Sequence, residues 1–171
     1  MSTQFGKVGR HKFHGDPKRF EVVTGFIATK YGKSIKYIAD IAGGRGMLTR
    51  MLNKKSYEAE VVDPRGWALK GVPTRKEEFN SDMADYYDLI IGLHPDEATR
   101  SVVESAKIRP TLVIPCCNFW DKSKVLGRDA LIAEIENYFK ENRIEYEKIV
   151  FDFKGPMNIG LSTTPRSEAT G

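Results

Sequence analysis

The chain has 171 residues, of which 40% are hydrophobic and 29% are charged, a balance that excludes a disordered or membrane-embedded chain and fits one globular domain. No apolar run approaches the ~20 residues of a membrane span, and the basic start of the chain lacks the apolar segment of a signal peptide, so we expect a cytoplasmic protein. Its two cysteines, Cys116 and Cys117, are adjacent, which argues against a disulfide framework and fits a reducing compartment.

The net charge of +4 is unevenly distributed along the chain. Residues 1–36 carry eight Lys/Arg and two Asp/Glu, a net charge of +6, so the rest of the chain carries −2. Such a basic segment favours a polyanionic partner such as RNA, or it is a solvated tail that only aids solubility. We expect residues 1–15 to form an irregular basic arm, residues 16–163 one domain and residues 164–171 a loose tail.

The predicted elements begin with a helix. Asp16 is its expected N-cap, Pro17 is its first residue, and Gly32 ends it. The strand segments that follow are apolar runs, at 35–42, 57–64, 74–79, 87–93 and 111–117. The segments between them are helical at 45–55, 95–108 and 128–143, and short-helical or irregular at 65–72.

Two strand-like segments, 144–153 and 157–163, close the chain on either side of a turn at 154–156. They are too close in sequence to pair in parallel, so we expect an antiparallel hairpin. The alternation before them predicts right-handed crossovers. The sequence therefore predicts an α/β fold with one doubly wound, mainly parallel sheet that ends in this hairpin.

Residues 37–47, YIADIAGGRGM, lead from an apolar strand through an acid into a glycine turn. Ligands of an open parallel sheet bind beyond the carboxyl ends of its strands, where this turn is expected. Glycines allow a ligand to approach the backbone, and the N–H groups at the start of the next helix favour an anionic group. About twenty residues later, the next strand ends at Asp63, which can accept both hydroxyls of a ribose.

Two features favour an aminoacyl-nucleoside over a dinucleotide as the ligand. The third glycine of a G-x-G-x-x-G fingerprint is missing, because Met47, Leu48 and Thr49 follow Gly46. Asp40 would repel a pyrophosphate, whereas it suits the ammonium group of an amino acid. The alternative is that the glycines only make a tight strand-to-helix turn beside two surface acids.

The segments DIAGGRG and VVDP resemble motif I and the acidic second-strand motif of class I S-adenosylmethionine-dependent methyltransferases, and the order of elements resembles that Rossmann-like fold from residue 16 onward. The resemblance implies S-adenosylmethionine as the cofactor. It places Asp40 near the ammonium group, Asp63 on the ribose and Pro64 against the adenine. The other cofactor-binding candidates lie in the turn and at the end of the third strand: Ala42, Gly43, Gly44, Gly46, Glu78 and Phe79.

A shorter resemblance concerns the Gly-Leu-His after the fourth strand and the Cys-Cys after the fifth. They are similar to a smaller group, the methyltransferase-like proteins around the tRNA 2′-O-methyltransferase of the Trm13 type and its METTL25-like relatives. Here Pro95-Asp96 replaces the Cys-Gly that follows the histidine in that group. This departure puts any transferred catalytic role in doubt.

Methyl transfer requires the nucleophile to be aligned with the methyl group, and at most an acceptor for the nucleophile's proton. The candidates for that catalytic role are His94 and Asp96. The pKa of an ordinary histidine suits a base, and the alternative for His94 is a cap on the strand end or a contact with the cofactor.

The candidate substrate-binding residues lie at the end of the fifth strand, Cys116 and Cys117, and in the loop after it, Trp120. Trp120 could stack on a base, and packing in the core is the alternative for all three. No metal is expected, because His11 and His14 with two adjacent cysteines make a poor ligand set.

The sequence thus predicts an S-adenosylmethionine-dependent methyltransferase that acts on RNA. The Asn/Asp-Pro-Pro-aromatic motif of amino-group methyltransferases is absent after the fourth strand, so the acceptor atom stays open. Two alternatives remain. One is a non-catalytic cofactor-binding or partner subunit of a modification complex, and the other is a nicotinamide-dependent enzyme.

Overall fold

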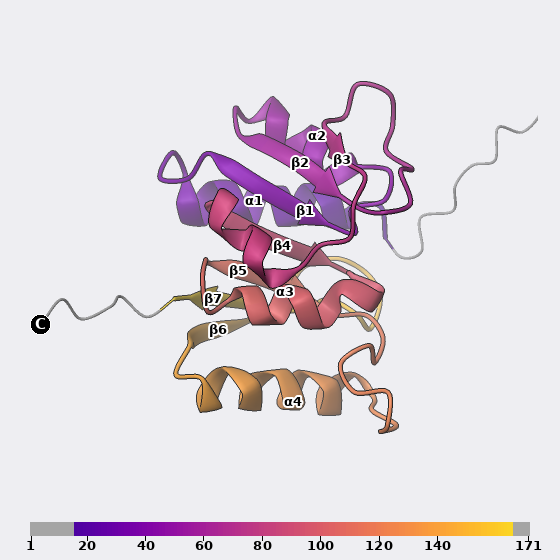
Figure 1. Cartoon of the computed structure of the whole chain (residues 1–171), viewed down its shortest axis with the longest axis vertical. Helices are drawn as coiled ribbons and strands as arrows, with labels where there is room; N and C mark the ends of the chain where they lie inside the picture. Colours follow the sequence, from indigo (N-terminus) through magenta and orange to yellow (C-terminus); the bar gives the residue numbers. More distant parts are fainter. Residues whose placement is uncertain (1–15, 166–171) are drawn as a thin grey trace, which may run out of the picture.

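The computed structural model describes residues 16–165, which build one seven-stranded sheet in the order β3-β2-β1-β4-β5-β7-β6 (Figure 1). The strands are β1 (Tyr37–Ile41), β2 (Glu58–Val62), β3 (Thr74–Arg75), β4 (Leu89–Leu93), β5 (Thr111–Ile114), β6 (Glu145–Val150) and β7 (Ile159–Thr164). Strands β1 to β5 are parallel, and β7 is antiparallel to both of its neighbours, β5 and β6. The predicted fold class is therefore confirmed, including the closing antiparallel hairpin.

Helices cover both faces of this sheet. The α-helices are α1 (Arg19–Tyr31), α2 (Met47–Lys54), α3 (Thr99–Ser105) and α4 (Arg128–Glu141), and the 3-10 helices are η1 (Ser81–Tyr86) and η2 (Asp96–Ala98). Among residues 16–165, no helix is both long and apolar enough to cross a membrane. The predicted basic arm and residues 166–171 of the predicted tail lie outside the described residues.

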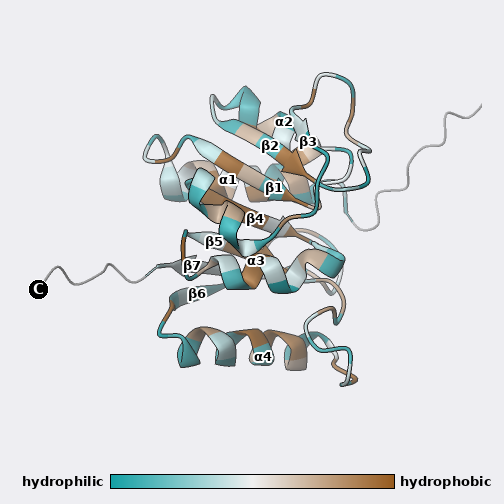
Figure 2. Cartoon of the chain, in the orientation of Figure 1, coloured by the Kyte–Doolittle hydropathy of each residue, from teal (hydrophilic) through white to brown (hydrophobic). Residues whose placement is uncertain are grey.

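The core forms two apolar layers, one on each face of the sheet, because successive side chains of a strand point to opposite faces. Ile38 of β1 packs in the layer under α1 and α2, whereas its neighbour Ala39 packs in the layer under α3 and α4. Figure 2 shows the hydrophobic colours gathered on the central strands between these helices. Residues at the ends of these strands are consequently held by packing on both sides, which fixes the loops that follow them.

The first helix begins later than predicted, at Arg19 instead of Pro17, and its N-cap is Lys18 instead of Asp16. The chain makes a turn before it, in which the Asp16 carboxylate accepts a hydrogen bond from the backbone N–H of Lys18 (3.0 Å). The same carboxylate accepts a hydrogen bond from the N–H of Lys154 (2.9 Å), in the connection between β6 and β7. Asp16 therefore ties the start of the domain to the closing hairpin.

Other elements are shorter than predicted. The fifth strand ends at Ile114, so Cys116 and Cys117 lie in the loop after it. The third strand ends at Arg75, because Glu77 N–H bonds back to the carbonyl of Arg75 (2.9 Å) and turns the chain away from the sheet edge. The predicted helix at 95–108 is a 3-10 turn followed by the short α3. The cause lies at its start, where Asp96 adopts a left-handed φ of +48° that an α-helix does not allow.

Candidate functional site

A crevice lies beyond the carboxyl ends of β1, β2 and β4, and it contains two adjoining cavities. The first cavity, of about 450 Å³, is lined by the strand ends and η2, including Val62, Asp63, Glu78, Phe79, Pro95 and Phe119. The second, of about 570 Å³, is lined by the glycine turn, α1 and the segment after β5, including Arg19, Gly44, Trp67, His94, Cys116 and Cys117. Ala42, Arg65 and Asp96 line both cavities and thus form the wall between them.

The glycine turn between β1 and α2 is shaped by close contacts within the chain. A Cβ atom on Gly43 would lie 2.5 Å from Oδ2 of Asp40, and a Cβ atom on Gly46 would lie 2.6 Å from Cγ1 of Val72. Gly46 also has a left-handed φ of +80°, which L-residues rarely adopt. The backbone therefore forms the floor of the second cavity with no side chain over it at these positions.

Asp40, at the end of β1, is 2% exposed. Its Oδ2 accepts a hydrogen bond from the hydroxyl of Thr49 on α2 (2.9 Å). Burial raises the pKa of Asp40 to about 7, although the hydrogen bonds from Thr49 oppose that rise, and the nearby charge of Asp63 adds to it. The carboxyl is thus much easier to protonate than an ordinary aspartate, and a cation beside it would favour the charged form.

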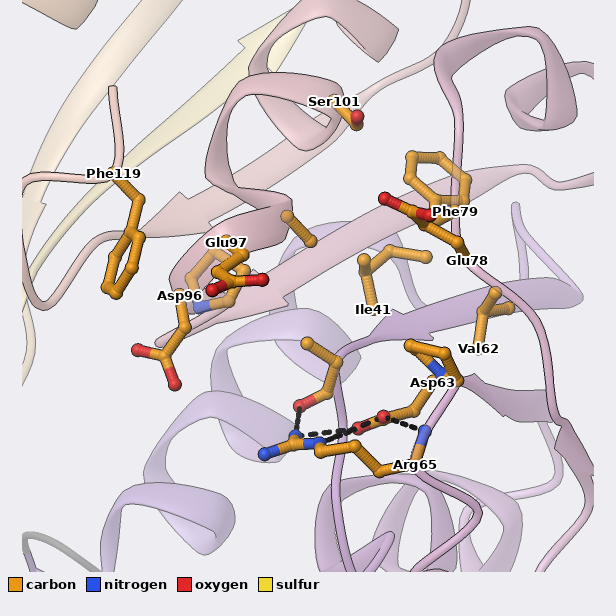
Figure 3. A pocket seen from close by; sticks show the side chains of 14 residues that line it. Ile41, Val62, Asp63, Arg65, Glu78, Phe79, Asp96, Glu97, Ser101 and Phe119 are labelled. Carbon is orange, nitrogen blue, oxygen red and sulfur yellow. Dashed lines mark hydrogen bonds and ion pairs between the residues drawn. The ribbon is translucent and has the colours of Figure 1, made fainter. Parts of the chain in front are cut away.

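Asp63, at the end of β2, is 1% exposed and pairs with Arg65, which sequence reasoning missed. The guanidinium donates from Nε to Oδ1 (3.0 Å) and from Nη2 to Oδ2 (2.7 Å), as the dashed lines of Figure 3 show. The backbone N–H groups of Arg65 (2.9 Å) and Gly44 (3.1 Å) donate to the same carboxylate. Burial alone would raise the pKa of Asp63, but these hydrogen bonds and the Arg65 charge leave it below the ordinary value.

The first cavity brings together three residues that were predicted to contact a nucleobase, namely Pro64, Glu78 and Phe79. Phe79 is 3% exposed, so its ring is fixed in the wall. Figure 3 shows Phe119 across the cavity from Phe79, while the carboxylates of Glu78 and Glu97 reach toward the space between them. Apolar walls with acceptors at the edge suit a flat heterocycle that carries amino groups.

The loop after β4 holds both predicted catalytic residues in left-handed backbone conformations, with φ of +51° at His94 and +48° at Asp96. Strain of this kind persists only where the surroundings enforce it. The His94 backbone N–H donates to the carbonyl of Ile114 (2.9 Å), and its ring Nε2 donates to the carbonyl of Met157 (2.8 Å). Burial lowers the pKa of His94, so the ring is neutral at neutral pH and offers Nδ1 as its acceptor.

Asp96 contacts one of the two cysteines, since the thiol of Cys116 donates to its Oδ1 (2.9 Å). Burial and the adjacent Asp96 raise the pKa of Cys116, which is therefore a thiol and not a thiolate at neutral pH. Cys117 is exposed and lines the second cavity with Cys116. The structure thus gathers His94, Asp96 and both cysteines on one side of the crevice.

Trp120 is not brought to the crevice. It is 8% exposed, its ring packs edge-on against Tyr138 of α4 (centroids 5.3 Å apart), and Arg100 of α3 lies over it (4.0 Å). Its neighbour Phe119 lines the first cavity instead. The predicted stacking of Trp120 on a substrate is corrected accordingly, because the ring is part of the core between two helices.

No group of three or more His, Cys, Asp and Glu side chains within residues 16–165 could hold a metal ion. The predicted pair His11 and His14 lies outside the described residues.

No protein-family model matches the chain, and no curated protein matches it in sequence. Solved structures are similar to it in fold. A crystal structure of DesVI from Streptomyces venezuelae has a TM-score of 0.57 and 12% identity, and the match covers 86% of this chain and 90% of that one. The sugar N-methyltransferase KedS8 from Streptoalloteichus sp. has a TM-score of 0.56 and 14% identity, and the match covers 88% of each chain.

A third similar structure is magnesium protoporphyrin IX methyltransferase (ChlM) from Synechocystis with bound S-adenosylmethionine, at a TM-score of 0.56 and 14% identity over 87% of this chain and 79% of that one. The chain has the fold of S-adenosylmethionine-dependent methyltransferases. At these identities the likeness is one of fold alone. The resemblance to the tRNA 2′-O-methyltransferase group stays a prediction.

Proposed function

We propose that the chain is an S-adenosylmethionine-dependent methyltransferase whose cofactor occupies both cavities, with its adenosine part in the first and its methionine part in the second. The observation that carries this proposal is the bare glycine turn between two buried carboxyls, of which Asp63 lines the first cavity and Asp40 the second. A nucleoside joined to an amino acid is the ligand that matches both ends.

The residues present fit this cofactor. Phe79 and Pro64 would hold the adenine, Asp63 the ribose hydroxyls and Asp40 the ammonium group. The closeness of a Gly43 Cβ to the Asp40 carboxylate shows that the turn has no room for a side chain at this position. One adjustment is required, because Arg65 now occupies the oxygens of Asp63 that ribose hydroxyls would use.

Bound S-adenosylmethionine would supply an electrophilic methyl group on its sulfonium sulfur, and this sulfur becomes a neutral thioether when the methyl group is transferred. The chain's own part is to align the acceptor and to take its proton. His94 Nδ1 and the Asp96 carboxylate are the acceptors at the crevice, and the strained backbone fixes both side chains. A neutral His94 held through Nε2 is suited to accept a proton at Nδ1.

The acceptor class that we propose is RNA, as the net charge of +6 on residues 1–36 suggests. KedS8 acts on a sugar and ChlM on magnesium protoporphyrin IX, so related folds serve chemically different acceptors. A second candidate function is a non-catalytic subunit that keeps the fold. The saturation of Asp63 by Arg65 favours it, because a site that has lost its ligand can be closed by an internal ion pair.

Isothermal titration of the full chain with S-adenosylhomocysteine, S-adenosylmethionine and NAD tests the cofactor. We expect the first two to bind and NAD not to bind. Asp63→Asn should weaken S-adenosylhomocysteine binding, whereas Asp85→Asn, which removes another arginine-paired carboxylate outside both cavities, should not. Failure of S-adenosylhomocysteine to bind would refute the proposal. Transfer of radiolabelled methyl groups to total RNA or to protein would then separate an enzyme from a non-catalytic subunit.

A further inference from the structure

In the two segments that flank β2, every Asp, Glu, Lys or Arg position is a lysine or an arginine. Residues 43–57 contain four Lys/Arg and no Asp/Glu, and residues 64–76 also contain four Lys/Arg and no Asp/Glu. The acids between them lie on or directly after β2, and each is already paired: Glu58 with Lys36, Glu60 with Arg75 and Asp63 with Arg65. The positive charge of the flanking segments is therefore largely uncompensated.

Three of the remaining cations lie where α2 meets the crossover between β2 and β3. A groove of about 330 Å³ lies there, and Arg50 and Lys54 of α2 face Lys70 of the crossover across it. Within the described part of the chain, no carboxylate forms an ion pair with any of these three side chains. Three cations around one concave surface without a counter-charge suit a chain of phosphates.

The crossover that lines the groove is also tied to the crevice. The crossover is fastened to the glycine turn by a hydrogen bond from Leu69 N–H to the carbonyl of Arg45 (2.9 Å), and the Arg45 side chain donates to the carbonyl of Trp67 (3.5 Å). Arg45 and Trp67 also line the second cavity, next to His94. We name these residues of the groove and of the adjoining crossover the basic seam and define it by five residues: Arg45, Arg50, Lys54, Trp67 and Lys70.

Trp67 stands at the junction of the seam and the second cavity with 56% of its surface exposed. The guanidinium of Arg65 lies 4.6 Å from the centre of its ring. A single exposed tryptophan is common on a protein surface and by itself indicates nothing. An exposed indole at the end of a line of unpaired cations is the arrangement by which proteins stack bases and follow the backbone of single-stranded nucleic acid.

We propose that the basic seam binds single-stranded RNA, with phosphates along Arg50, Lys54 and Lys70 and a base on Trp67, so that the next nucleotide enters the second cavity. This assignment gives the substrate class of the methyltransferase proposed above and rests on that function. A duplex keeps its bases stacked and offers none to Trp67, so single strands are preferred. A lipid surface would call for a broad apolar face beside the cations, and Trp67 is the one large apolar side chain of the seam.

The test measures binding of a fluorescent, unstructured single-stranded RNA of about 16 nucleotides to the full chain without cofactor. In the seam variant, Arg50, Lys54 and Lys70 are each changed to glutamate. The control variant changes Lys33, Lys107 and Lys140 to glutamate, which alters the net charge equally. These lysines are exposed, pair with no carboxylate within residues 16–165 and line none of the three cavities. Thermal unfolding and S-adenosylhomocysteine titration report whether each variant keeps its fold and its cofactor site.

We expect the seam variant to lose at least about tenfold in RNA affinity at low salt, and its plot of log K against log salt to flatten by about 2, as the loss of three phosphate contacts on a single strand predicts. The control variant should lose much less. Trp67→Ala should weaken binding by roughly tenfold, and Trp67→Phe should restore most of it, because base stacking needs an aromatic ring.

Four results would overturn the assignment: no RNA binding by the natural chain, an equal loss in the seam and control variants, duplex bound as well as single strand, or preferential seam-dependent binding to phosphatidylserine vesicles. A separate measurement tests the proposed function. If the natural chain does not bind S-adenosylhomocysteine, that function is refuted, whatever the RNA measurement gives. RNA binding that depends on the seam would stand even then, as the property of a binding subunit.

Discussion

Removal of the ion pair between Arg65 and Asp63 should have two opposite effects. It should raise the affinity for the ligand and lower the stability of the protein without ligand. A nucleoside that uses both oxygens of Asp63 must first displace the Arg65 side chain, so removal of that side chain should tighten binding. A hydrogen bond to a charged group contributes about 1.5–3 kcal/mol, but Arg65 is 40% exposed and water replaces part of that contribution. We therefore expect Arg65→Ala to strengthen S-adenosylhomocysteine binding by about 1–2 kcal/mol, or roughly 5- to 30-fold.

The same substitution should destabilise the protein without ligand, because it leaves the 1% exposed carboxylate of Asp63 without its cation. A loss of about 2 kcal/mol corresponds to a fall in Tm of roughly 4–8 °C for a chain of this length. Isothermal titration gives the affinity and differential scanning fluorimetry gives the Tm. The matched control is Arg75→Ala, which breaks the ion pair with Glu60 outside both cavities of the crevice and should lower the Tm without a change in affinity.

A variant that binds S-adenosylhomocysteine more weakly than the natural chain would refute this reasoning. Such a result would mean that Arg65 stays in place as a ligand contact, and that the ribose is held elsewhere. An unchanged affinity would mean that the ligand does not use Asp63 at all.

Three further predictions concern the same crevice. Asp40 has a pKa of about 7 in the folded protein, so between pH ~4 and ~7 it binds more protons there than in the unfolded chain. The free energy of unfolding should therefore fall by roughly 2–4 kcal/mol as the pH rises through this window. Denaturant titrations at several pH values measure this fall, and Asp40→Asn should abolish it. Affinity for S-adenosylhomocysteine should rise over the last part of that window, because its ammonium group favours charged Asp40. Gly43→Ala places a methyl group 2.5 Å from the Asp40 carboxylate and should weaken S-adenosylhomocysteine binding at least about tenfold in a titration. The control Gly127→Ala, whose Cβ would have no atom within 4 Å, should leave the affinity unchanged. His94→Ala should lower the single-turnover methyl-transfer rate by about 10²–10⁴-fold with little change in affinity, and an unaffected rate would remove His94 as the proton acceptor.

The positions of the strand ends could be predicted from sequence, and with them most of the proposed cofactor site. Apolar runs fix the strands, and a parallel sheet brings their carboxyl ends to one edge. Asp40 and Asp63 therefore had to lie near each other. Their different states could not be predicted, because the proton on Asp40 depends on its complete burial and the charge of Asp63 on the direction of the Arg65 side chain.

The residues after the strands were harder to predict because irregular backbone has no fixed period. Phe119 and Trp120 are adjacent and both aromatic, yet the first lines the cavity and the second is buried against α4. In the same way, His94 and Asp96 adopt left-handed conformations that the sequence does not announce, since neither is a glycine. The signal for Arg65 was present in the sequence Asp-Pro-Arg, where a cation two residues after a buried acid can fold back on it.

The electrostatics of the crevice explain how two buried carboxyls can lie so close together in one fold. Two uncompensated charges at 1% and 2% exposure would be costly, and each is relieved differently, Asp40 by a proton and Asp63 by Arg65. A proton and an arginine side chain can both be displaced by a ligand, whereas apolar side chains at these positions could not bind one through a charge. A ligand with an ammonium group at one end and hydroxyl donors at the other can take over both roles, releasing the proton and the guanidinium. In the function that we propose, the two buried acids are thus held ready for the ligand by partners that it can displace.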